Sequence, residues 1–131
     1  MTFITIIFSS CKRDNLENCT EHLVTTCSED TTKTNLRIKN ISKYDFCNVV
    51  VMTASGDANY GIIKEGETTC YIAFDTVYSY SYIQLYIGNK DCKYMIYDYV
   101  GEEPLGVGKF TYLIDLPEYR SGELSITVQE D

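Results

Sequence analysis

The sequence predicts an all-β domain, and three observations support this fold class. Apolar and polar residues alternate over several short runs, turn residues separate these runs, and no run has the period of an amphipathic helix. The composition agrees, since the 131 residues include 12 Tyr and only 2 Pro, and tyrosine favours strands. Strands at this spacing are typical of a sandwich or a barrel, and a chain of this length forms one domain with its own core.

The first half of the predicted domain contains four short strands. NLRIKN, residues 35–40, alternates and places Leu36 and Ile38 on one face. DFCNVVVMTA is the second strand, and its alternate residues Cys47, Val49 and Val51 are expected to share a face. SGDAN then predicts a turn, YGII a short strand before the turn KEGE, and TTCYIAF the fourth strand.

The second half begins with the clearest alternation in the chain, YSYIQLYI. One face of this strand is expected to hold Ser81, Ile83, Leu85 and Ile87, and the other face to hold Tyr80, Tyr82, Gln84 and Tyr86. GNKD predicts a hairpin turn in which Gly and Asn supply positive φ angles, and CKYMIYDYV returns from it. A loop, GEEPLGVG, precedes the last two strands, KFTYLIDL and ELSITVQ, which makes about eight strands.

One motif narrows the fold class. Leu105, Gly108, Phe110 and Tyr112 are spaced as leucine, glycine, aromatic, any residue, aromatic. This pattern resembles the entry to the penultimate strand of immunoglobulin-like and fibronectin type III domains, where the aromatic residues fill a corner of the sandwich. The resemblance implies an immunoglobulin-like or fibronectin type III-like β-sandwich of about 7–8 antiparallel strands.

The amino-terminal segment combines an apolar run with small residues and a cysteine. FITIIF, residues 3–8, is followed by Ser9, Ser10 and Cys11. The end of this stretch, FSSC, resembles a bacterial lipobox, which implies that Cys11 carries a lipid and that residues 1–10 are removed. The apolar run is short and no basic residue precedes it, so we interpret residues 1–10 as a truncated lipoprotein signal peptide. A short buried strand that ends at a cysteine is the alternative.

The next segment has the composition of a linker. Residues 12–33 are polar, rich in threonine and charge, and show no sustained period. We therefore expect a truncated signal peptide over residues 1–10, a flexible linker over 11–33 and the β-sandwich over 34–131. A lipid anchor followed by a disordered tether is consistent with this order.

A longer resemblance concerns the cellular location of the protein. The stretches IKNISKYDFCNVVV, YGIIKEGETTCYIAF, YSYIQLYI and DYVGEEPLGVGKFTYLIDL look like those of small lipoproteins of unknown function from Bacteroidetes bacteria. The resemblance implies a lipid-anchored protein of the outer membrane, on either its periplasmic or its surface-exposed face. DTT at residues 30–32 and DTV at 75–77 also resemble short O-glycosylation sites of these bacteria, and Thr31 is the preferred acceptor.

The cysteine count leaves the disulfide state open. If Cys11 is lipidated, five cysteines remain, so at least one stays free or pairs between chains. Three cysteines fall in strand-like runs: Cys47, Cys70 and Cys92. Either all three are buried free thiols, or two of them form a disulfide. Four residues of the amino-terminal region have side chains that can bind zinc: Cys11, Cys19, His22 and Cys27. A zinc site is disfavoured because their spacing matches no common zinc motif.

Charge and motif content exclude several functions. The net charge of −8 disfavours nucleic acid as a partner and opposes adsorption to anionic headgroups. No glycine-rich phosphate-binding motif is present, so we expect no nucleotide partner and no cofactor. The single histidine, His22, falls in the predicted linker, where it is not held in position for catalysis. We therefore expect that the protein is not an enzyme.

The expected function is a non-catalytic interaction or structural module of the cell envelope, attached to the membrane through its lipid. Its partner is an unidentified protein or glycan. The alternative is a carbohydrate-binding module that uses an exposed tyrosine face, because aromatic rings stack on sugars and dominate protein contacts. The candidate residues of that face are Tyr78, Tyr80, Tyr82 and Tyr86, with Tyr99 from the loop near residues 98–104.

Overall fold

The computed structural model describes residue 16, residues 19–96 and residues 102–131, and all regular structure in this part of the chain is β. None of the described residues belongs to a helix that could cross a bilayer. The prediction of an all-β fold is confirmed. The strands are β1 (Thr34–Asn40), β2 (Cys47–Thr53), β3 (Gly56–Asn59), β4 (Ile72–Phe74), β5 (Tyr82–Ile87), β6 (Lys90–Tyr94), β7 (Gly108–Asp115) and β8 (Ser125–Glu130).

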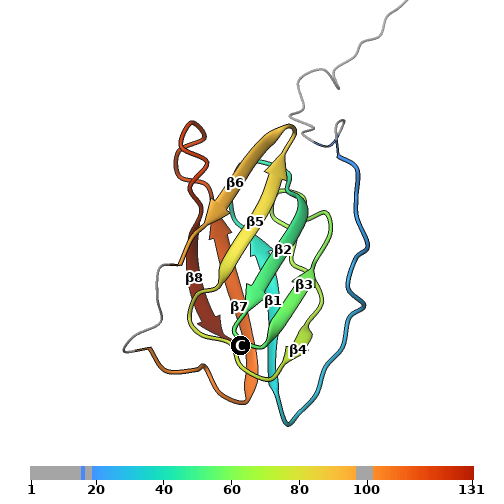
Figure 1. Cartoon of the computed structure of the whole chain (residues 1–131), viewed down its shortest axis with the longest axis vertical. Helices are drawn as coiled ribbons and strands as arrows, with labels where there is room; N and C mark the ends of the chain where they lie inside the picture. Colours follow the sequence, from blue (N-terminus) through green and yellow to red (C-terminus); the bar gives the residue numbers. More distant parts are fainter. Residues whose placement is uncertain (1–15, 17–18, 97–101) are drawn as a thin grey trace, which may run out of the picture.

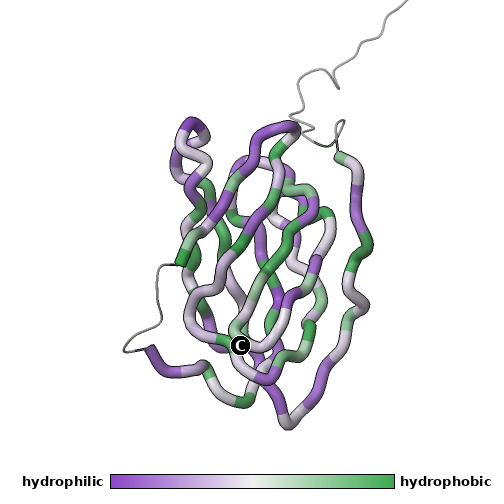
Figure 2. The backbone as a smooth tube through the Cα atoms, viewed as in Figure 1, coloured by the Kyte–Doolittle hydropathy of each residue, from purple (hydrophilic) through white to green (hydrophobic). Residues whose placement is uncertain are grey.

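The strands form two four-stranded sheets that stack on each other (Figure 1). One sheet has the order β4-β1-β7-β8 and the other has the order β3-β2-β5-β6. The space between them is filled by one alternate set of side chains from each central strand, as expected for a half-buried strand. Figure 2 shows the hydrophobic positions along these strands. The fully buried apolar residues include Leu36, Ile38, Val49, Val51, Ile83, Leu85, Tyr112 and Ile114.

The expectation that all strands are antiparallel is wrong at one place. β1 pairs in parallel with β7, from Thr34 opposite Gly108 to Asn40 opposite Ile114. A parallel pair needs a long crossover connection between its two strands. The stretch of chain from β2 to β6 lies between them in sequence and supplies this crossover.

The chain around residues 54–63 also differs from the expectation. Ala54 and Ser55 form a tight turn, and the next residues are strand β3 rather than a continued turn. The turn is closed by the Thr53 hydroxyl, which accepts from the Gly56 amide at 3.1 Å and donates to the Gly56 carbonyl at 2.7 Å. YGII is not a strand of its own and makes a single bridge, between Ile63 and Phe46.

Strand β2 contains a bulge that changes which face its first residue occupies. Cys47 pairs with Tyr86 and Val50 pairs with Gln84, so β2 has one extra residue between these pairs. An extra residue reverses the alternation of side chains. Val49 therefore lies in the core as predicted, whereas the prediction that Cys47 shares its face is wrong, because Cys47 lies on the outer face beside Tyr86.

The alternation predicted for β5 is confirmed. Its inward parity is buried and its outward parity, which includes Tyr82 and Tyr86, is half-buried. The predicted hairpin follows, with Ile87 opposite Lys90, although only Gly88 of its two turn residues has a positive φ, at 59°.

On β7, Tyr112 is fully buried, and its hydroxyl is hydrogen-bonded to Ser81 Oγ and donates to the Tyr78 carbonyl, each at 2.7 Å.

Candidate ligand-binding site

Residues 19–30 form an extended segment, here named the strap, that runs along the flank of the sandwich formed by β3 and β4 (Figure 1). The strap falls within the linker that the sequence predicts to be flexible, yet its backbone is bonded to both sheets. The Thr25 amide donates to the Asn59 carbonyl at 2.9 Å. The Ser28 amide donates to the Tyr71 carbonyl, next to β4, at 3.0 Å. The strap thus joins the edges of the two sheets on this flank.

Two disulfides fix the strap to the domain. Cys19 bonds to Cys47 at the start of β2, and Cys27 bonds to Cys70 just before β4. Neither alternative for Cys47 and Cys70 is correct, because each pairs with a strap cysteine instead of staying free or pairing within the domain. Cys92 is a buried free thiol, as one of those alternatives predicts.

The disulfides also bear on the zinc hypothesis. Cys19 and Cys27 belong to different disulfides, so neither is a thiolate that could bind a metal. The described part of the chain contains no group of three or more His, Cys, Asp or Glu side chains that could hold a metal ion.

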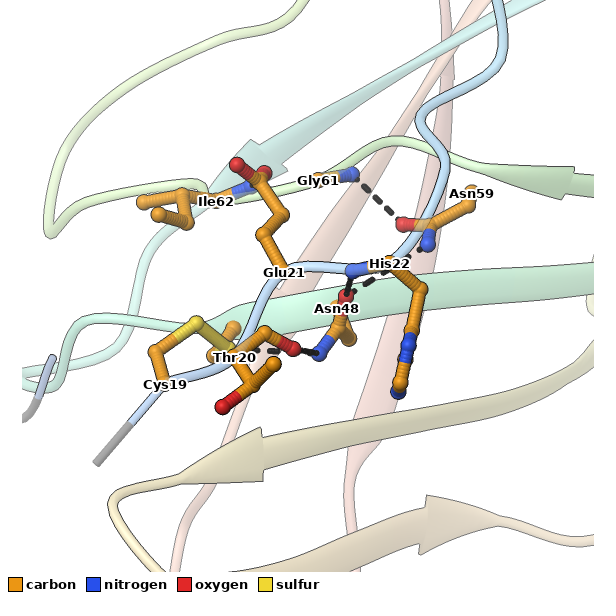
Figure 3. Close-up of a disulfide and its surroundings, with 9 residues drawn as sticks. Cys19, Thr20, Glu21, His22, Asn48, Asn59, Gly61 and Ile62 are labelled. Atoms are coloured by element: carbon orange, nitrogen blue, oxygen red, sulfur yellow. Dashed lines mark hydrogen bonds between the residues drawn. A yellow bond between two sulfur atoms is a disulfide. The ribbon is translucent and has the colours of Figure 1, made fainter.

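Asn48, the residue after Cys47, holds the strap through its side chain (Figure 3). Its Oδ1 accepts from the His22 amide at 2.8 Å, and its Nδ2 donates to the Thr20 carbonyl at 2.8 Å. The residue is only 5% exposed and has a φ of 50°, which asparagine tolerates better than most residues. The β2 bulge therefore places both a disulfide and an amide clamp against the strap.

A second close contact lies between Glu21 of the strap and residues Gly61 and Ile62. The Ile62 amide donates to Glu21 Oε2 at 2.9 Å. A Cβ atom on Gly61 would lie 2.6 Å from the same oxygen, and Gly61 has a φ of 80°. Glycine at this position therefore permits the close approach of the strap.

The strap and the β5–β6 turn border an open pocket of about 270 Å³ on the outer side of the β3-β2-β5-β6 sheet. The described residues of its walls supply one aromatic ring, one imidazole and two amide side chains, and no carboxylate. The imidazole belongs to His22, and neither it nor the amide of Asn89 makes a hydrogen bond to a described residue. The lining residues are Cys19, Thr20, His22, Cys47, Asn48, Tyr86, Gly88 and Asn89.

The structure brings only some of the candidate tyrosines together. Tyr82 and Tyr86 lie on the outer face of β5, with Gln84 between them. Tyr78 and Tyr80 precede the strand, and the ring of Tyr80 packs 6.1 Å from that of Tyr94 between centroids.

The other candidate positions are distributed over the chain. Tyr99 and Cys11 lie outside the described residues. Thr31 is exposed in a turn where Asp30 accepts from both the amide and the hydroxyl of Thr32. These two hydrogen bonds lower the pKa of Asp30.

The outer face of the other sheet carries a closed polar network. Asp131 accepts from the Thr111 hydroxyl at 2.6 Å and from the Tyr71 hydroxyl at 2.7 Å, and Arg37 lies over the Tyr71 ring. Burial alone would raise the pKa of Asp131, but the hydrogen bonds from Thr111, Tyr71 and Gln129 and the charge of Arg37 together lower it. Because these groups satisfy one another, this network offers fewer groups to a ligand than the pocket does.

Sequence reasoning did not find the pocket. It assigned His22 to a flexible linker and gave no role to Asn48 or Asn89. The available signal was the presence of two cysteines, Cys19 and Cys27, in a segment otherwise typical of a linker, because a disulfide would attach that segment to the domain. Comparisons of the chain with family models, curated proteins and solved structures find no match.

Proposed function

We propose that the protein is a non-catalytic interaction or structural module of the bacterial cell envelope, anchored by lipid at Cys11. The observation that carries this proposal is the pair of disulfides, Cys19–Cys47 and Cys27–Cys70. Disulfides form and persist in oxidising compartments and are rare in the cytosol. The disulfides therefore favour an extracytoplasmic address, which agrees with the lipobox-like sequence that ends at Cys11.

The non-catalytic part of the proposal is supported by the surroundings of His22. Its amide is bonded to Asn48, and no described serine, cysteine thiol or carboxylate is hydrogen-bonded to its imidazole. Nucleophilic catalysis by a Ser–His or Cys–His pair requires such a contact.

We also propose that the sandwich is of the immunoglobulin-like type in its broad sense. Two four-stranded sheets and the buried Phe110 and Tyr112 of the resembling motif support this assignment. The strand orders β4-β1-β7-β8 and β3-β2-β5-β6 differ from the four-on-three order of immunoglobulin constant domains. The proposal therefore extends to the two-layer architecture and not to the strand order of those domains.

The Cys19–Cys47 disulfide shortens the proposed tether. Cys19 lies eight positions after Cys11, and eight residues span at most about 27 Å when fully extended. The linker predicted from sequence would allow the sandwich to move much further from its anchor. The end of the sandwich that holds Cys47 would thus stay close to the membrane surface.

The test is expression of the gene with its upstream region in a related bacterium, followed by mass measurement of the amino-terminal peptide. We expect a diacyl or triacyl mass on Cys11 and partitioning of the protein into detergent. Cys11→Ser should abolish both, whereas Cys92→Ser, a control at the buried thiol, should leave both unchanged. An unmodified Cys11 thiol in a soluble protein would contradict the proposal.

Carbohydrate binding is a second candidate function, favoured by the position of Tyr86. Its side chain lies on the outer face of β5 and also lines the pocket, and aromatic rings are good contact surfaces for sugars and proteins. A glycan array probed with the whole chain at high protein concentration tests this candidate. Absence of binding to every glycan would remove it and leave the proposal of an envelope interaction module in place.

A further inference from the structure

We infer that the pocket between the strap and the β5–β6 turn binds a single neutral sugar ring; this rests on the carbohydrate-binding candidate and specifies its site. The pocket combines a half-buried aromatic side chain, Tyr86, with hydrogen-bonding groups from two other segments. Sugars present an apolar face of C–H groups and a rim of hydroxyls, so they need both kinds of contact. The pocket supplies the two kinds within one volume.

The hydrogen-bonding groups divide into used and available ones. Asn48 is fully engaged, because its Oδ1 and Nδ2 hold the strap. The imidazole of His22 and the amide of Asn89 line the same pocket without a hydrogen bond to a described residue. An amide both donates and accepts, and a neutral imidazole does the same through its two nitrogens. Both groups therefore match hydroxyls, which also donate and accept.

The charge of the site selects a neutral ligand. No Asp, Glu, Lys or Arg among the described residues lines the pocket. An ammonium or metal cation would find no carboxylate among the described lining residues, and the net charge of −8 repels phosphate and carboxylate ligands. A neutral polyol can use an aromatic ring, an imidazole and an amide together, through its C–H face and its hydroxyls.

The size of the pocket matches about one sugar ring. Its volume of about 270 Å³ is slightly below the range of about 300–1,000 Å³ that is typical of pockets for drug-sized ligands. A longer glycan would extend out of the pocket over the outer face of β5. There it would meet Gln84 and Tyr82, which point the same way as Tyr86.

The strap fixes the geometry of the site before a ligand arrives. The Cys19–Cys47 disulfide and the Asn48 clamp hold the backbone of His22 against β2. A pre-ordered site avoids the conformational cost of ordering the strap on binding. Sugar affinity should therefore depend on this disulfide, even though neither sulfur atom is needed for recognition.

The experiment is a titration of the ¹⁵N-labelled chain with glucose, galactose, mannose and N-acetylglucosamine, each to about 50 mM, followed by amide chemical shifts. We expect at least one sugar to bind with a Kd of about 1–10 mM and to shift the amides of His22, Gly88 and the Asn89 side chain. Tyr86→Ala and Asn89→Ala should each weaken binding by about tenfold or more. Tyr119→Ala, a control at an exposed tyrosine outside the site, should bind like the wild type.

Two further results distinguish failure of the pocket as the site from failure of carbohydrate binding itself. If a sugar binds and Tyr82→Ala abolishes binding while Tyr86→Ala and Asn89→Ala do not, the open face is the site and the pocket inference is overturned. If none of these sugars and no glycan on the array binds, the inference and the carbohydrate candidate both fail. Removal of the disulfide in the double variant Cys19→Ser with Cys47→Ser should reduce binding while the amide spectrum remains that of a folded protein.

Discussion

The two flanks of the sandwich are closed in different ways. On the flank of β3 and β4, the strap bonds to both sheet edges and is attached by two disulfides. On the flank of β6 and β8, the described residues join the sheets through the chain around Lys93. Its amide donates to the Gly122 carbonyl, and its carbonyl accepts from the Leu124 amide, each at 2.9 Å. One flank is covered by a separate segment, and the other by neighbouring strands and loops.

The difference shows what a polar segment needs in order to cover a sheet edge. An edge strand presents unpaired amide and carbonyl groups, and covering it prevents pairing with another chain. The strap buries little apolar surface, since Leu23 is 92% and Val24 is 42% exposed. Burial therefore cannot offset the entropy lost when the strap is ordered. The disulfides reduce that loss because they restrict the unfolded chain as well.

The largest effect that we predict is the loss of one strap disulfide. The pairs close loops with sequence separations of 28 and 43 residues. Loops of this length correspond to about 3–4 kcal/mol of unfolding free energy per disulfide, and the two overlap in sequence, so they are not expected to add fully. The double variant Cys27→Ser with Cys70→Ser should show this decrease in urea unfolding. A decrease below about 1 kcal/mol would mean that the strap is held by its hydrogen bonds.

A smaller effect is expected from the Asn48 clamp. Asn48→Ala removes two hydrogen bonds from a buried site and places alanine at a φ of 50°, so we expect about 2–4 kcal/mol of destabilisation. Asn48→Gly removes the same bonds but accepts the φ angle, and should be about 1 kcal/mol more stable than the alanine variant. Urea unfolding measures both, and hydrogen exchange at the His22 amide should accelerate in both. A glycine variant as stable as the wild type would show that the clamp contributes nothing.

The smallest effect concerns the thiol on the other flank. Burial raises the pKa of Cys92 to about 11; Lys90 opposes this shift and Asp91 adds to it. The folded pKa exceeds the unfolded value of about 8.5, so the neutral thiol contributes stability below pH 8.5 that is lost as the pH rises toward 11. In the folded protein at pH 8, iodoacetamide should leave Cys92 unmodified, as measured by peptide mass, whereas the urea-unfolded protein should react. Rapid labelling in the folded state would contradict the burial of this thiol.

The alternation of side chains was predictable because it follows from strand geometry alone. The faces of β5 were correctly predicted, and so were Leu36 and Ile38 as core residues. The alternation failed at Cys47, because a one-residue bulge leaves no mark in an alternating sequence. It also failed to identify β3, since GDAN has the composition of a turn and becomes a strand only by pairing with β2.

Three properties were readable from the sequence: the β class, the buried parity of the central strands and the surplus of one cysteine if Cys11 is modified. Those properties depend on local geometry and on counting. Three others emerge only in the folded chain: the disulfide partners, the parallel pairing of β1 with β7 and the pocket that includes His22, Tyr86 and Asn89. These properties depend on which distant segments become neighbours, and the crossover and the β2 bulge that bring them together are set by the packing of the two sheets.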